Sequence, residues 1–470
     1  MKVGCIVAGS RLQSGPVLEV RSPYSGEVVG SVVQAGAADT ERAISTGLGY
    51  RSKLTRYQRY EILNRARELL QERAEEFAVR ITSESGLCLR ETRYEVGRAS
   101  DVLQFAAIEA LQDDGQTFSC DVSPQGKARK IFTTREPLGL AVAITPFNHP
   151  LNQVVHKVAP SVAANTPMIL KPSEKTPLTA IAFVELLLES GLPPEMLSVV
   201  LGPTKEVAEK LVTDPRTELV TFTGSVAVGK RIAATAGYKR LVLELGGNDP
   251  LIILADADMD LAVTLAAEGS FRNSGQRCTA VKRILVAEEI HDAFLERFVA
   301  KAAEYVAGDP IDPATRVGTV IDEPSAVYLE EAVKDSVAQG ARVLLGGGRR
   351  GALLEPTVIA DVPRESRMVC EESFGPLAPV LKISGVDDAI SLANSTAYGL
   401  SSGVVTQSLN DALRCIKELR VGTVNINEVP GYRIERSPFG GIKDSGLGIK
   451  EGVIEAIKSM TVVKTFSLPW

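Results

Sequence analysis

Hydrophobic and polar residues alternate along this chain with two different periods. Over 56–80, apolar side chains recur every three or four residues between charged ones, which predicts an amphipathic helix. A second helix is predicted over 90–112. After about residue 126, short apolar runs alternate with segments long enough for helices. This alternation predicts a parallel sheet that helices cover on both faces.

The predicted strands form two successive sets. The first set is 138–144, 166–170, 197–201, 219–222 and 241–245, and the second is 282–286, 342–345, 377–383, 403–406 and 422–425. The two sets therefore predict two α/β units. The sequence contains no short repeat, and no flexible linker separates the two units. Near the end, a predicted helix over 452–458 leads into an alternating strand over 459–466. That strand needs a sheet edge, either in its own chain or in another subunit.

Length and charge restrict the class of protein. A chain of 470 residues is too long for one core and predicts two or three domains. The net charge of -6 argues against nucleic acids and anionic membranes as partners. The six cysteines include no Cys-x-x-Cys pair, so neither a bound metal nor a disulfide framework is expected. With no signal peptide or long apolar stretch, we expect a cytoplasmic protein.

A cysteine and a glutamate are the leading candidates for chemistry. Cys278 ends the sequence Gly275-Gln276-Arg277-Cys278. The thiolate is the nucleophilic form of cysteine, and a neighbouring guanidinium or a helix N-terminus lowers the thiol pKa. Upstream, Glu244 precedes a glycine pair that lets another molecule approach the backbone. Together they predict a nucleophile and a base that act on a carbonyl group.

Further polar residues follow the ends of predicted strands, where open α/β sheets bind ligands. Asn148 offers an amide to an oxyanion, or forms a turn before His-Pro. Lys171 and Glu174 suit a ribose diol and disfavour a 2′-phosphate, with a capping turn as the alternative. Ser225 starts a predicted helix whose free amides suit a pyrophosphate.

Two other segments have features of nucleotide-binding sites. Glu372 and Phe374 can bind a ribose hydroxyl and a flat heterocycle, or form a solvated acidic turn. The segment 224–231 imitates a P-loop, but Arg231 stands where a hydroxyl group must bind Mg²⁺, which excludes a nucleoside triphosphatase. No Gly-x-Gly-x-x-Gly fingerprint follows a predicted strand.

Seven segments in this order resemble the motifs of the aldehyde dehydrogenase superfamily: Thr145-Pro146-Phe147-Asn148, Lys171-Pro172-Ser173-Glu174, Phe222-Thr223-Gly224-Ser225, Glu244-Leu245-Gly246-Gly247, Gly275-Gln276-Arg277-Cys278, Glu372-Ser373-Phe374-Gly375-Pro376 and Pro438-Phe439-Gly440-Gly441. The resemblance implies an α/β fold with two parallel-sheet domains. A Rossmann-like NAD-binding domain would span 1–115 and 138–246, and a catalytic domain 247–437. A small β oligomerisation arm would comprise 116–137 and 455–470 and would support a homodimer or homotetramer.

The resemblance also implies roles for individual residues. Cys278 would be the nucleophile, Asn148 and the amide of Cys278 the oxyanion hole, and Glu244 the base that activates water. A thiohemiacetal would give a thioester, and because relatives that transfer the acyl group to coenzyme A tend to lack this glutamate, hydrolysis is expected. The implied cofactor is NAD, favoured over NADP, and its implied contacts are Thr145, Phe147, Lys171, Ser173, Glu174, Gly224, Ser225, Val228, Leu245, Gly246, Glu372 and Phe374. Phe147 departs from the tryptophan of many relatives.

The expected substrate is a small anionic aldehyde. Segments 431–435, 443–446 and 467–470 resemble the phosphonoacetaldehyde dehydrogenase branch, in which residues matching Arg98, His149 and Arg277 grip the phosphonate. Phosphonoacetaldehyde or phosphonoformaldehyde would then be oxidised, although Arg277 can instead form a structural ion pair. The alternatives are a non-phosphorylating glyceraldehyde-3-phosphate, succinate semialdehyde or lactaldehyde dehydrogenase. From another class, an inactive NAD-binding structural protein is the alternative.

Overall fold

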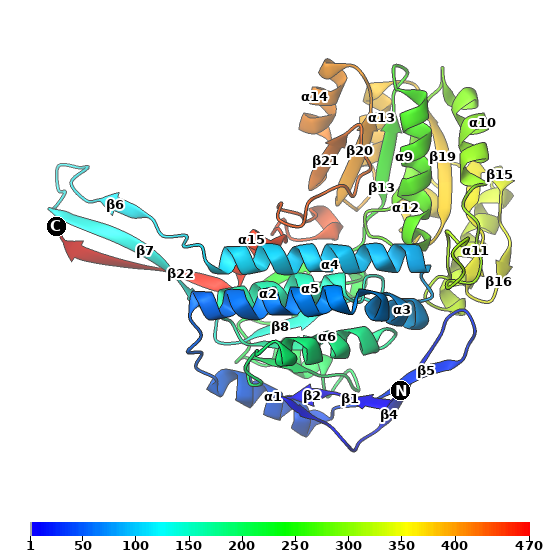
Figure 1. Ribbon diagram of the computed structural model, residues 1–470. Coiled ribbons are helices and arrows are strands. Elements are labelled where there is room, and N and C mark those ends of the chain that lie inside the picture. Colours follow the sequence, from blue (N-terminus) through cyan, green and yellow to red (C-terminus); the bar gives the residue numbers. More distant parts are fainter. Residues whose placement is uncertain (1) are drawn as a thin grey trace.

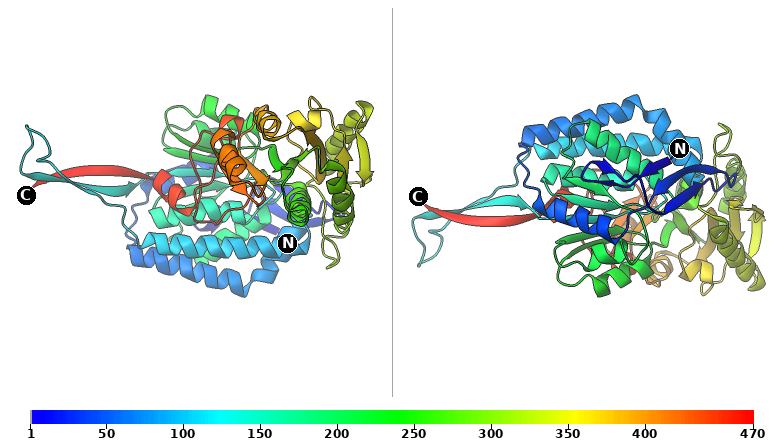
Figure 2. Two further views of the ribbon diagram at one scale, coloured as in Figure 1. Left: turned by 90° about the horizontal axis from the view of Figure 1, so that it is seen from above. Right: turned by 90° about the horizontal axis from the view of Figure 1, so that it is seen from below.

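Two seven-stranded sheets form the body of the computed structural model, which describes residues 2–470. A three-stranded β arm projects from this body and carries the C-terminus at its far end (Figure 1, Figure 2). A separate small sheet has the order β1-β5-β4 and comprises Lys2–Gly4, Val28–Val33 and Val17–Arg21. No helix within residues 2–470 is both long and apolar enough to cross a bilayer.

The first large sheet has the strand order β12-β11-β8-β9-β10-β2-β3. Its strands in that order are Arg240–Glu244, Leu219–Thr223, Ala141–Ile144, Met168–Lys171, Leu197–Val199, Ile6–Val7 and Ser10–Arg11. The first five are parallel, and β2 and β3 extend the sheet in antiparallel fashion. The predicted parallel sheet is confirmed, although the sequence pattern did not reveal the short N-terminal strands.

Helices cover both faces of this sheet, as predicted. They are α1 Ala37–Gly49, α2 Arg56–Glu72, α3 Ala74–Ser85, α4 Leu89–Ala110, α5 Asn152–Ala164, α6 Pro177–Glu189, α7 Ala208–Thr213 and α8 Val226–Thr235. The prediction of one helix over 56–80 was wrong. The chain leaves helical geometry at Arg73 (φ -108°, ψ 22°), whose guanidinium pairs with Glu189 at 2.6 Å. The break lets α3 pack at a new angle against α4 and α6.

The second large sheet has the order β15-β18-β19-β14-β13-β20-β21. Its strands in that order are Arg342–Leu345, Thr357–Ala360, Leu377–Ile383, Val281–Ala287, Asp249–Ile253, Ser401–Val405 and Thr423–Ile426. All neighbours are parallel except β15 and β18. The sequence analysis missed β13, a central strand, because Pro250 lies inside it. The ladder shifts register between Asp249 and Pro250, and such an irregularity tolerates proline.

Two separate apolar cores lie on the faces of the second sheet. Along β13, Leu251 and Ile253 face one core, and Ile252 faces the other, as the twofold period of a strand requires. The covering elements are α9 Met259–Phe271, α10 His291–Ala302, α11 Glu323–Ala338, α12 Arg367–Cys370, α13 Val386–Asn394 and α14 Leu409–Glu418, with a β16–β17 hairpin of Arg349–Arg350 and Leu353–Leu354 at the edge.

The arm consists of β6 Thr117–Ser119, β7 Arg129–Pro137 and β22 Thr461–Pro469. The terminal strand β22 follows α15 Val453–Ser459 and pairs antiparallel with β7 over its whole length, from Thr461 opposite Pro137 to Pro469 opposite Arg129. Of the two possibilities left by the sequence, the strand therefore closes a sheet within its own chain. Phe132 and Phe466 stack across it, with ring centroids 5.5 Å apart.

Candidate functional site

The segment before Cys278 makes an unusual turn. After α9, the backbone enters η1 (Arg272–Gly275), and three consecutive residues, Asn273, Ser274 and Gly275, have positive φ angles of 55°, 53° and 67°. A Cβ atom on Gly275 would lie 2.1 Å from the carbonyl oxygen of Gly375, so only glycine fits there. The Asn273 amide holds the turn by donating to the Asn148 carbonyl at 3.1 Å. This turn presents Cys278 at the boundary of the two large sheets.

Cys278 lies where two cavities meet. One cavity, of about 530 Å³, opens beside the first sheet and has a largely apolar lining. The other, of about 300 Å³, is lined by charged residues from both sheets and from α4. Three residues line both cavities, namely Gln153, Thr223 and Cys278. A molecule in either cavity can therefore reach the same sulfur atom.

The apolar cavity collects most of the predicted cofactor contacts. Those in its lining are Phe147, Gly224, Ser225, Leu245, Gly246, Glu372 and Phe374, together with Asn148. Ser225 caps α8, accepts a hydrogen bond from the Val228 amide and lines the cavity, so the N-terminus of this helix lies at the cavity wall. Phe147 and Phe374 meet edge to face, with ring centroids 5.8 Å apart.

Five predicted cofactor contacts lie outside this lining. Lys171 is the last residue of β9, the neighbour of β8, and Ser173 and Glu174 follow it; Glu174 lines a different cavity with Lys175. Thr145 directly follows β8 and is buried, and its hydroxyl has no hydrogen-bond partner within residues 2–470. Val228 lies in the first turn of α8 and is 46% exposed. These residues lie near the carboxyl ends of β8 and β9 or at the start of α8, and none of them lines the cavity beside Cys278.

The carboxylate of Glu372 is fixed at the edge of the apolar cavity. Its Oε1 accepts hydrogen bonds from the Gly247 amide at 3.0 Å and from Lys282 Nζ at 2.9 Å. Within residues 2–470, its Oε2 receives no hydrogen bond. A Cβ atom on Gly246 would lie 2.2 Å from this Oε2, so the glycine leaves room for the carboxylate.

Asn148 and the amide of Cys278 both offer free donors near the sulfur. Asn148 is buried, and one N–H of its side chain donates to the Gln276 carbonyl at 2.8 Å, which leaves a second N–H. The Cys278 amide N–H makes no hydrogen bond within the described part of the chain. Both groups can therefore donate to an oxygen atom placed beside the thiol.

The surroundings of the thiol differ from the expectation of an arginine-activated cysteine. Burial raises the pKa of Cys278 to about 11, and the charges that oppose this rise are first Lys282 and then Arg433. Arg277 instead turns its guanidinium to the last turn of α9, where it donates to the carbonyls of Glu268 and Gly269. The arginine adjacent in sequence therefore binds the end of its own helix, and the cations that most favour the thiolate are Lys282 and Arg433.

Glu244 ends β12 and lines the charged cavity with Cys278. Both of its carboxyl oxygens are buried without a hydrogen-bond partner. Burial, followed by the charge of Glu451, raises the pKa of Glu244 well above its ordinary value, whereas Lys157 opposes this rise. Lys157 itself donates to Glu451 at 2.5 Å. Glu244 can therefore take up a proton readily.

All three predicted substrate contacts line the charged cavity, namely Arg98, His149 and Arg277. The sequence analysis missed Arg433, although it singled out the segment that contains it. Arg433 follows β21, makes no ion pair or hydrogen bond within residues 2–470, and lies over the Phe439 ring at 3.9 Å. Arg272 also lines the cavity, but it pairs with Glu91.

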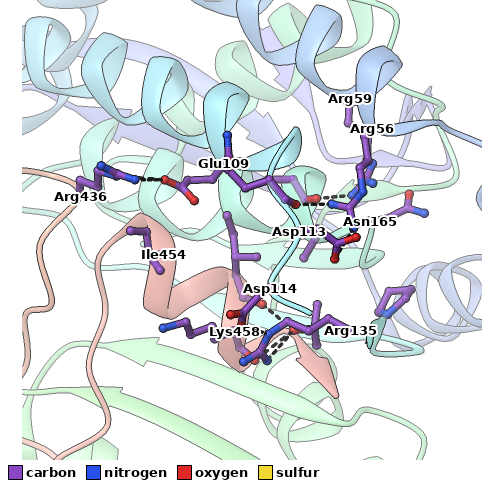
Figure 3. A pocket seen from close by; sticks show the side chains of 16 residues that line it. Arg56, Arg59, Glu109, Asp113, Asp114, Arg135, Asn165, Arg436, Ile454 and Lys458 are labelled. Carbon is purple, nitrogen blue, oxygen red and sulfur yellow. Dashed lines mark hydrogen bonds and ion pairs between the residues drawn. The ribbon is translucent and has the colours of Figure 1, made fainter. Parts of the chain in front are cut away.

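A further charged cavity lies at the foot of the arm (Figure 3). Arg56 pairs with Asp113 at 3.2 Å, Arg135 with Asp114 at 2.5 Å, and Arg436 with Glu109 at 2.6 Å. Neither a cysteine nor a histidine lines this cavity. Two of these ion pairs, those of Asp113 and Asp114, tie the segment that leads into the arm to α2 and to β7. The candidate chemistry therefore remains at Cys278.

Comparison with known proteins agrees with this geometry. The model of the aldehyde dehydrogenase family matches residues 11–466. The chain is 37% identical over 459 residues to the 3-sulfolactaldehyde dehydrogenase of Priestia aryabhattai, which covers 97% of this chain and 96% of that relative.

Two solved structures share the fold over the whole chain. Aldehyde dehydrogenase 21 of Physcomitrella patens, in complex with the reaction product succinate, superimposes with a TM-score of 0.96 and 35% identity and covers 100% of this chain and 98% of that one. The NADP-dependent glyceraldehyde-3-phosphate dehydrogenase of Bacillus halodurans C-125, complexed with NADP, gives a TM-score of 0.96, 32% identity, and coverage of 100% and 99%.

Proposed function

This chain belongs to the aldehyde dehydrogenase family, and we propose that it oxidises a small aldehyde with an anionic far end to the corresponding carboxylic acid. As a member of the family it is an NAD(P)-dependent oxidoreductase. One observation carries the proposal: the Arg433 guanidinium, with no partner among the described residues, shares a cavity with the Cys278 thiol.

The residues of the apolar cavity fit a nicotinamide dinucleotide. The free Oε2 of Glu372 can accept from a ribose hydroxyl, and Phe147 and Phe374 supply apolar surface for a flat ring. The N-terminus of α8 offers its amides to a pyrophosphate. When bound, the cofactor supplies a hydride acceptor beside the substrate carbon. Lys171 and Glu174 would contact its far ribose, with NAD preferred over NADP.

Cys278 would act as the nucleophile. Its thiolate attacks the carbonyl carbon, and the oxygen of the resulting thiohemiacetal accepts hydrogen bonds from the free N–H of Asn148 and the Cys278 amide. Loss of hydride leaves a thioester on the sulfur. Because burial raises the pKa of the thiol, Lys282 and Arg433 are the cations that favour the thiolate.

Glu244 would release the product. A water molecule that loses its proton to this carboxylate attacks the thioester, and the carboxylic acid leaves as the thiol re-forms. A raised pKa makes Glu244 a stronger base than an exposed carboxylate, and its position in the charged cavity supports this role. The charge of the Lys157 ammonium favours the ionised form of Glu244, whereas the charge of Glu451 disfavours it. A base in this position supports hydrolysis rather than transfer to coenzyme A.

The far end of the substrate would bind Arg433, with Arg98 and His149 beside it. Of the arginines in the charged cavity, Arg98 pairs with Glu435 and Arg272 with Glu91, and Arg277 is engaged by main-chain carbonyls. Arg433 therefore keeps the most donors for a ligand, and a guanidinium binds tetrahedral or planar oxyanions with two parallel hydrogen bonds.

Within this class, we favour a phosphonate-bearing aldehyde, either phosphonoacetaldehyde or phosphonoformaldehyde. A dianion matches a cavity in which Arg433 and Arg277 both lack a carboxylate partner. A sulfonate-bearing aldehyde is the second candidate, because the 37% identical relative is a 3-sulfolactaldehyde dehydrogenase. The phosphonate and sulfonate groups share three tetrahedral oxygen atoms and differ in charge.

A panel of aldehydes tests the proposal. NADH and NADPH formation would be compared for phosphonoacetaldehyde, phosphonoformaldehyde, 3-sulfolactaldehyde, glyceraldehyde 3-phosphate, succinate semialdehyde and lactaldehyde. In Arg433→Ala, kcat/KM for the preferred anionic aldehyde should fall roughly 10- to 100-fold more than kcat/KM for neutral lactaldehyde, the value of a charge-assisted hydrogen bond. The loss for lactaldehyde should reflect only the effect of Arg433 on the thiol. Arg272→Ala is the matched control, since that arginine is already paired.

Two results would contradict the proposal. Equal turnover of neutral and anionic aldehydes, unchanged in Arg433→Ala, would leave a general aldehyde dehydrogenase. No turnover of any aldehyde by a folded wild-type protein that binds NAD would favour the inactive structural protein instead. Preference for 3-sulfolactaldehyde over both phosphonates would replace the phosphonate by the sulfonate.

A further inference from the structure

We propose that Lys282 is a positioning residue that joins the cofactor-binding carboxylate of Glu372 to the nucleophile Cys278. It holds Glu372 toward the apolar cavity and places one positive charge beside the sulfur. This inference rests on the proposed function for the roles of Cys278 and Glu372. Nothing in the sequence pattern singled Lys282 out, because it reads as an ordinary residue at the start of a strand.

Lys282 ties together three segments that are distant in sequence. From β14, its Nζ donates to the Gly247 carbonyl at 2.9 Å, to the Cys278 carbonyl at 3.2 Å, and to Glu372 Oε1 at 2.9 Å. The side chain is 1% exposed. A buried ammonium with all three donors engaged has one fixed position, and so do the groups that accept from it.

The carboxylate of Glu372 is thereby oriented. Lys282 and the Gly247 amide both donate to Oε1, so the carboxylate cannot rotate without losing two hydrogen bonds. Oε2 is left facing the cavity in the space that Gly246 provides. The Lys282 ammonium also lies 5.4 Å from the centre of the Phe374 ring, the second group expected to contact the cofactor.

The same ammonium sets the charge around the thiol. The charged groups that face Cys278 come from several elements: Lys282 from β14, Arg433 from the segment after β21, Asp249 from β13, Glu372 from the segment after α12, Arg277 from its own turn, and Glu244 from the end of β12. Lys282 favours the thiolate more than any other group, whereas Glu372 disfavours it. Removing one or the other should change thiol reactivity in opposite directions.

This opposition separates the proposal from a purely structural role. If Lys282 only filled a buried position, Lys282→Met and Glu372→Gln would both loosen the same contacts and would change the thiol in the same direction. Arg283 provides a matched control, because it is the adjacent residue, is equally buried, and donates to the carbonyls of Asn248, Leu392 and Ala393 instead. Arg283→Lys should lower the melting temperature without altering the reactivity of Cys278.

The experiment is the pH profile of Cys278 alkylation by iodoacetamide, followed by mass spectrometry of the Cys278 peptide in the protein without aldehyde. The other five cysteines serve as internal references. In Lys282→Met, we expect the profile to move upward by about one pH unit, so that alkylation slows about tenfold at pH 8. In Glu372→Gln, the profile should move downward. Lys282→Arg, which keeps the charge, should lie nearer to wild type than Lys282→Met.

Calorimetric titration with NAD measures the affinity for the cofactor and provides a second test that does not depend on turnover. Lys282→Met should weaken NAD binding about tenfold although it does not touch the cofactor, and Glu372→Gln should weaken it as well. Profiles that move in the same direction in both variants, or that match wild type in folded Lys282→Met, would overturn the proposal. Failure of the proposed substrate would instead appear in the aldehyde panel and would leave the alkylation profiles unchanged.

Discussion

Arg98 and Glu435 form an ion pair of 2.5 Å between α4 and the segment that carries Arg433. The second oxygen of Glu435 lies 2.5 Å from Nε2 of His156, on α5. One buried carboxylate thus joins two helices of the first unit to a segment that follows the second sheet. The positions of Arg98 and Arg433 relative to the Cys278 thiol depend on this carboxylate.

We therefore predict that Glu435→Gln destabilises the protein. Although burial favours the neutral acid, the contacts with His156 and Arg98 hold the pKa of Glu435 well below its ordinary value of 4.5. Burial lowers the pKa of His156 itself, so the positive charge that persists beside Glu435 at neutral pH is that of Arg98. Breaking a buried pair costs about 3–5 kcal/mol. A carboxylate with a lowered pKa stabilises the fold above its unfolded pKa, and this contribution is lost as the pH falls through the folded pKa.

Urea unfolding of Glu435→Gln and wild type between pH 2 and pH 8 measures this contribution. The deficit of the variant should be constant at neutral pH and should shrink as the pH falls below 4.5, the ordinary pKa of the carboxyl group. Glu136→Gln, at the exposed ion pair with Lys464, should change the free energy of unfolding by less than about 1 kcal/mol. A pH-independent deficit in Glu435→Gln would mean that packing, not charge, holds Arg98.

Glu244→Gln should have the opposite effect on stability. Burial raises the pKa of Glu244, so the folded state holds this proton more strongly than the unfolded chain does. As the pH rises above the ordinary value of 4.5, the unfolded chain ionises first and wild type loses stability until the pH reaches the folded pKa. Each pH unit in that window costs about 1.4 kcal/mol.

The variant carries no such charge, so its melting temperature should exceed that of wild type at pH 8. The difference should vanish near pH 4. A lower melting temperature of Glu244→Gln at pH 8 would indicate that the carboxylate makes a favourable contact when ionised. A gain in stability at the expense of activity is expected where a buried group serves chemistry.

Glu244→Gln should also separate the two halves of the reaction. Thiolate attack and hydride loss need Cys278 and Asn148, whereas hydrolysis needs the base. We expect one rapid equivalent of NADH per active site, followed by a steady state that is slower by about 10²- to 10⁴-fold, the usual contribution of general base catalysis. Stopped-flow absorbance at 340 nm resolves both phases. Hydroxylamine, which cleaves thioesters without a base, should restore turnover, and a steady state equal to wild type would remove Glu244 from the mechanism.

Cofactor preference should depend on Glu174. This carboxylate lies 3.4 Å from Lys171 at the end of β9 and is about half exposed. It would repel the additional phosphate of NADP. Glu174→Ser should raise the ratio of kcat/KM with NADP to that with NAD by about fivefold, because one nearby like charge is worth about 1 kcal/mol. Lys171→Met is expected to impair both cofactors alike. An unchanged ratio in Glu174→Ser would show that other residues choose the cofactor.

The sequence predicted which residues lie at the site better than it predicted the contacts that their side chains make. Cys278, Asn148 and Glu372 lie where strand ends and turns indicated, because the carboxyl ends of parallel strands must meet at one edge. The direction of the Arg277 side chain could not be predicted, since a neighbour in sequence can turn to an unsatisfied helix end. Arg433 approaches the thiol only through folding, and the contact of Lys282 with Cys278 depends on the turn between them. In the same way, the apolar period that continues across Arg73 gave no sign that the helix ends there.

The arm should be required for assembly. It projects from the body as three strands, and Phe118, Phe466, Leu468 and Trp470 on it are each more than 40% exposed (Figure 2). A sheet of this size is marginally stable alone and leaves its edges open, so we expect it to be covered by another subunit in a homodimer or homotetramer. Deleting 461–470 removes the partner of β7 along its whole length.

Light scattering coupled to size exclusion should then show a multiple of the chain mass for wild type and a monomer for the deletion. Trp470→Ser is the matched control, because it removes the contacts of the indole ring with Lys130, at 4.0 Å, and with the Phe132 ring, at 6.4 Å, and leaves the β7–β22 ladder intact. The cavities beside Cys278 lie in the body, so the deleted protein should still bind NAD if it folds. A monomeric wild type would contradict the role of the arm, whereas an assembled deletion variant would transfer that role to another surface.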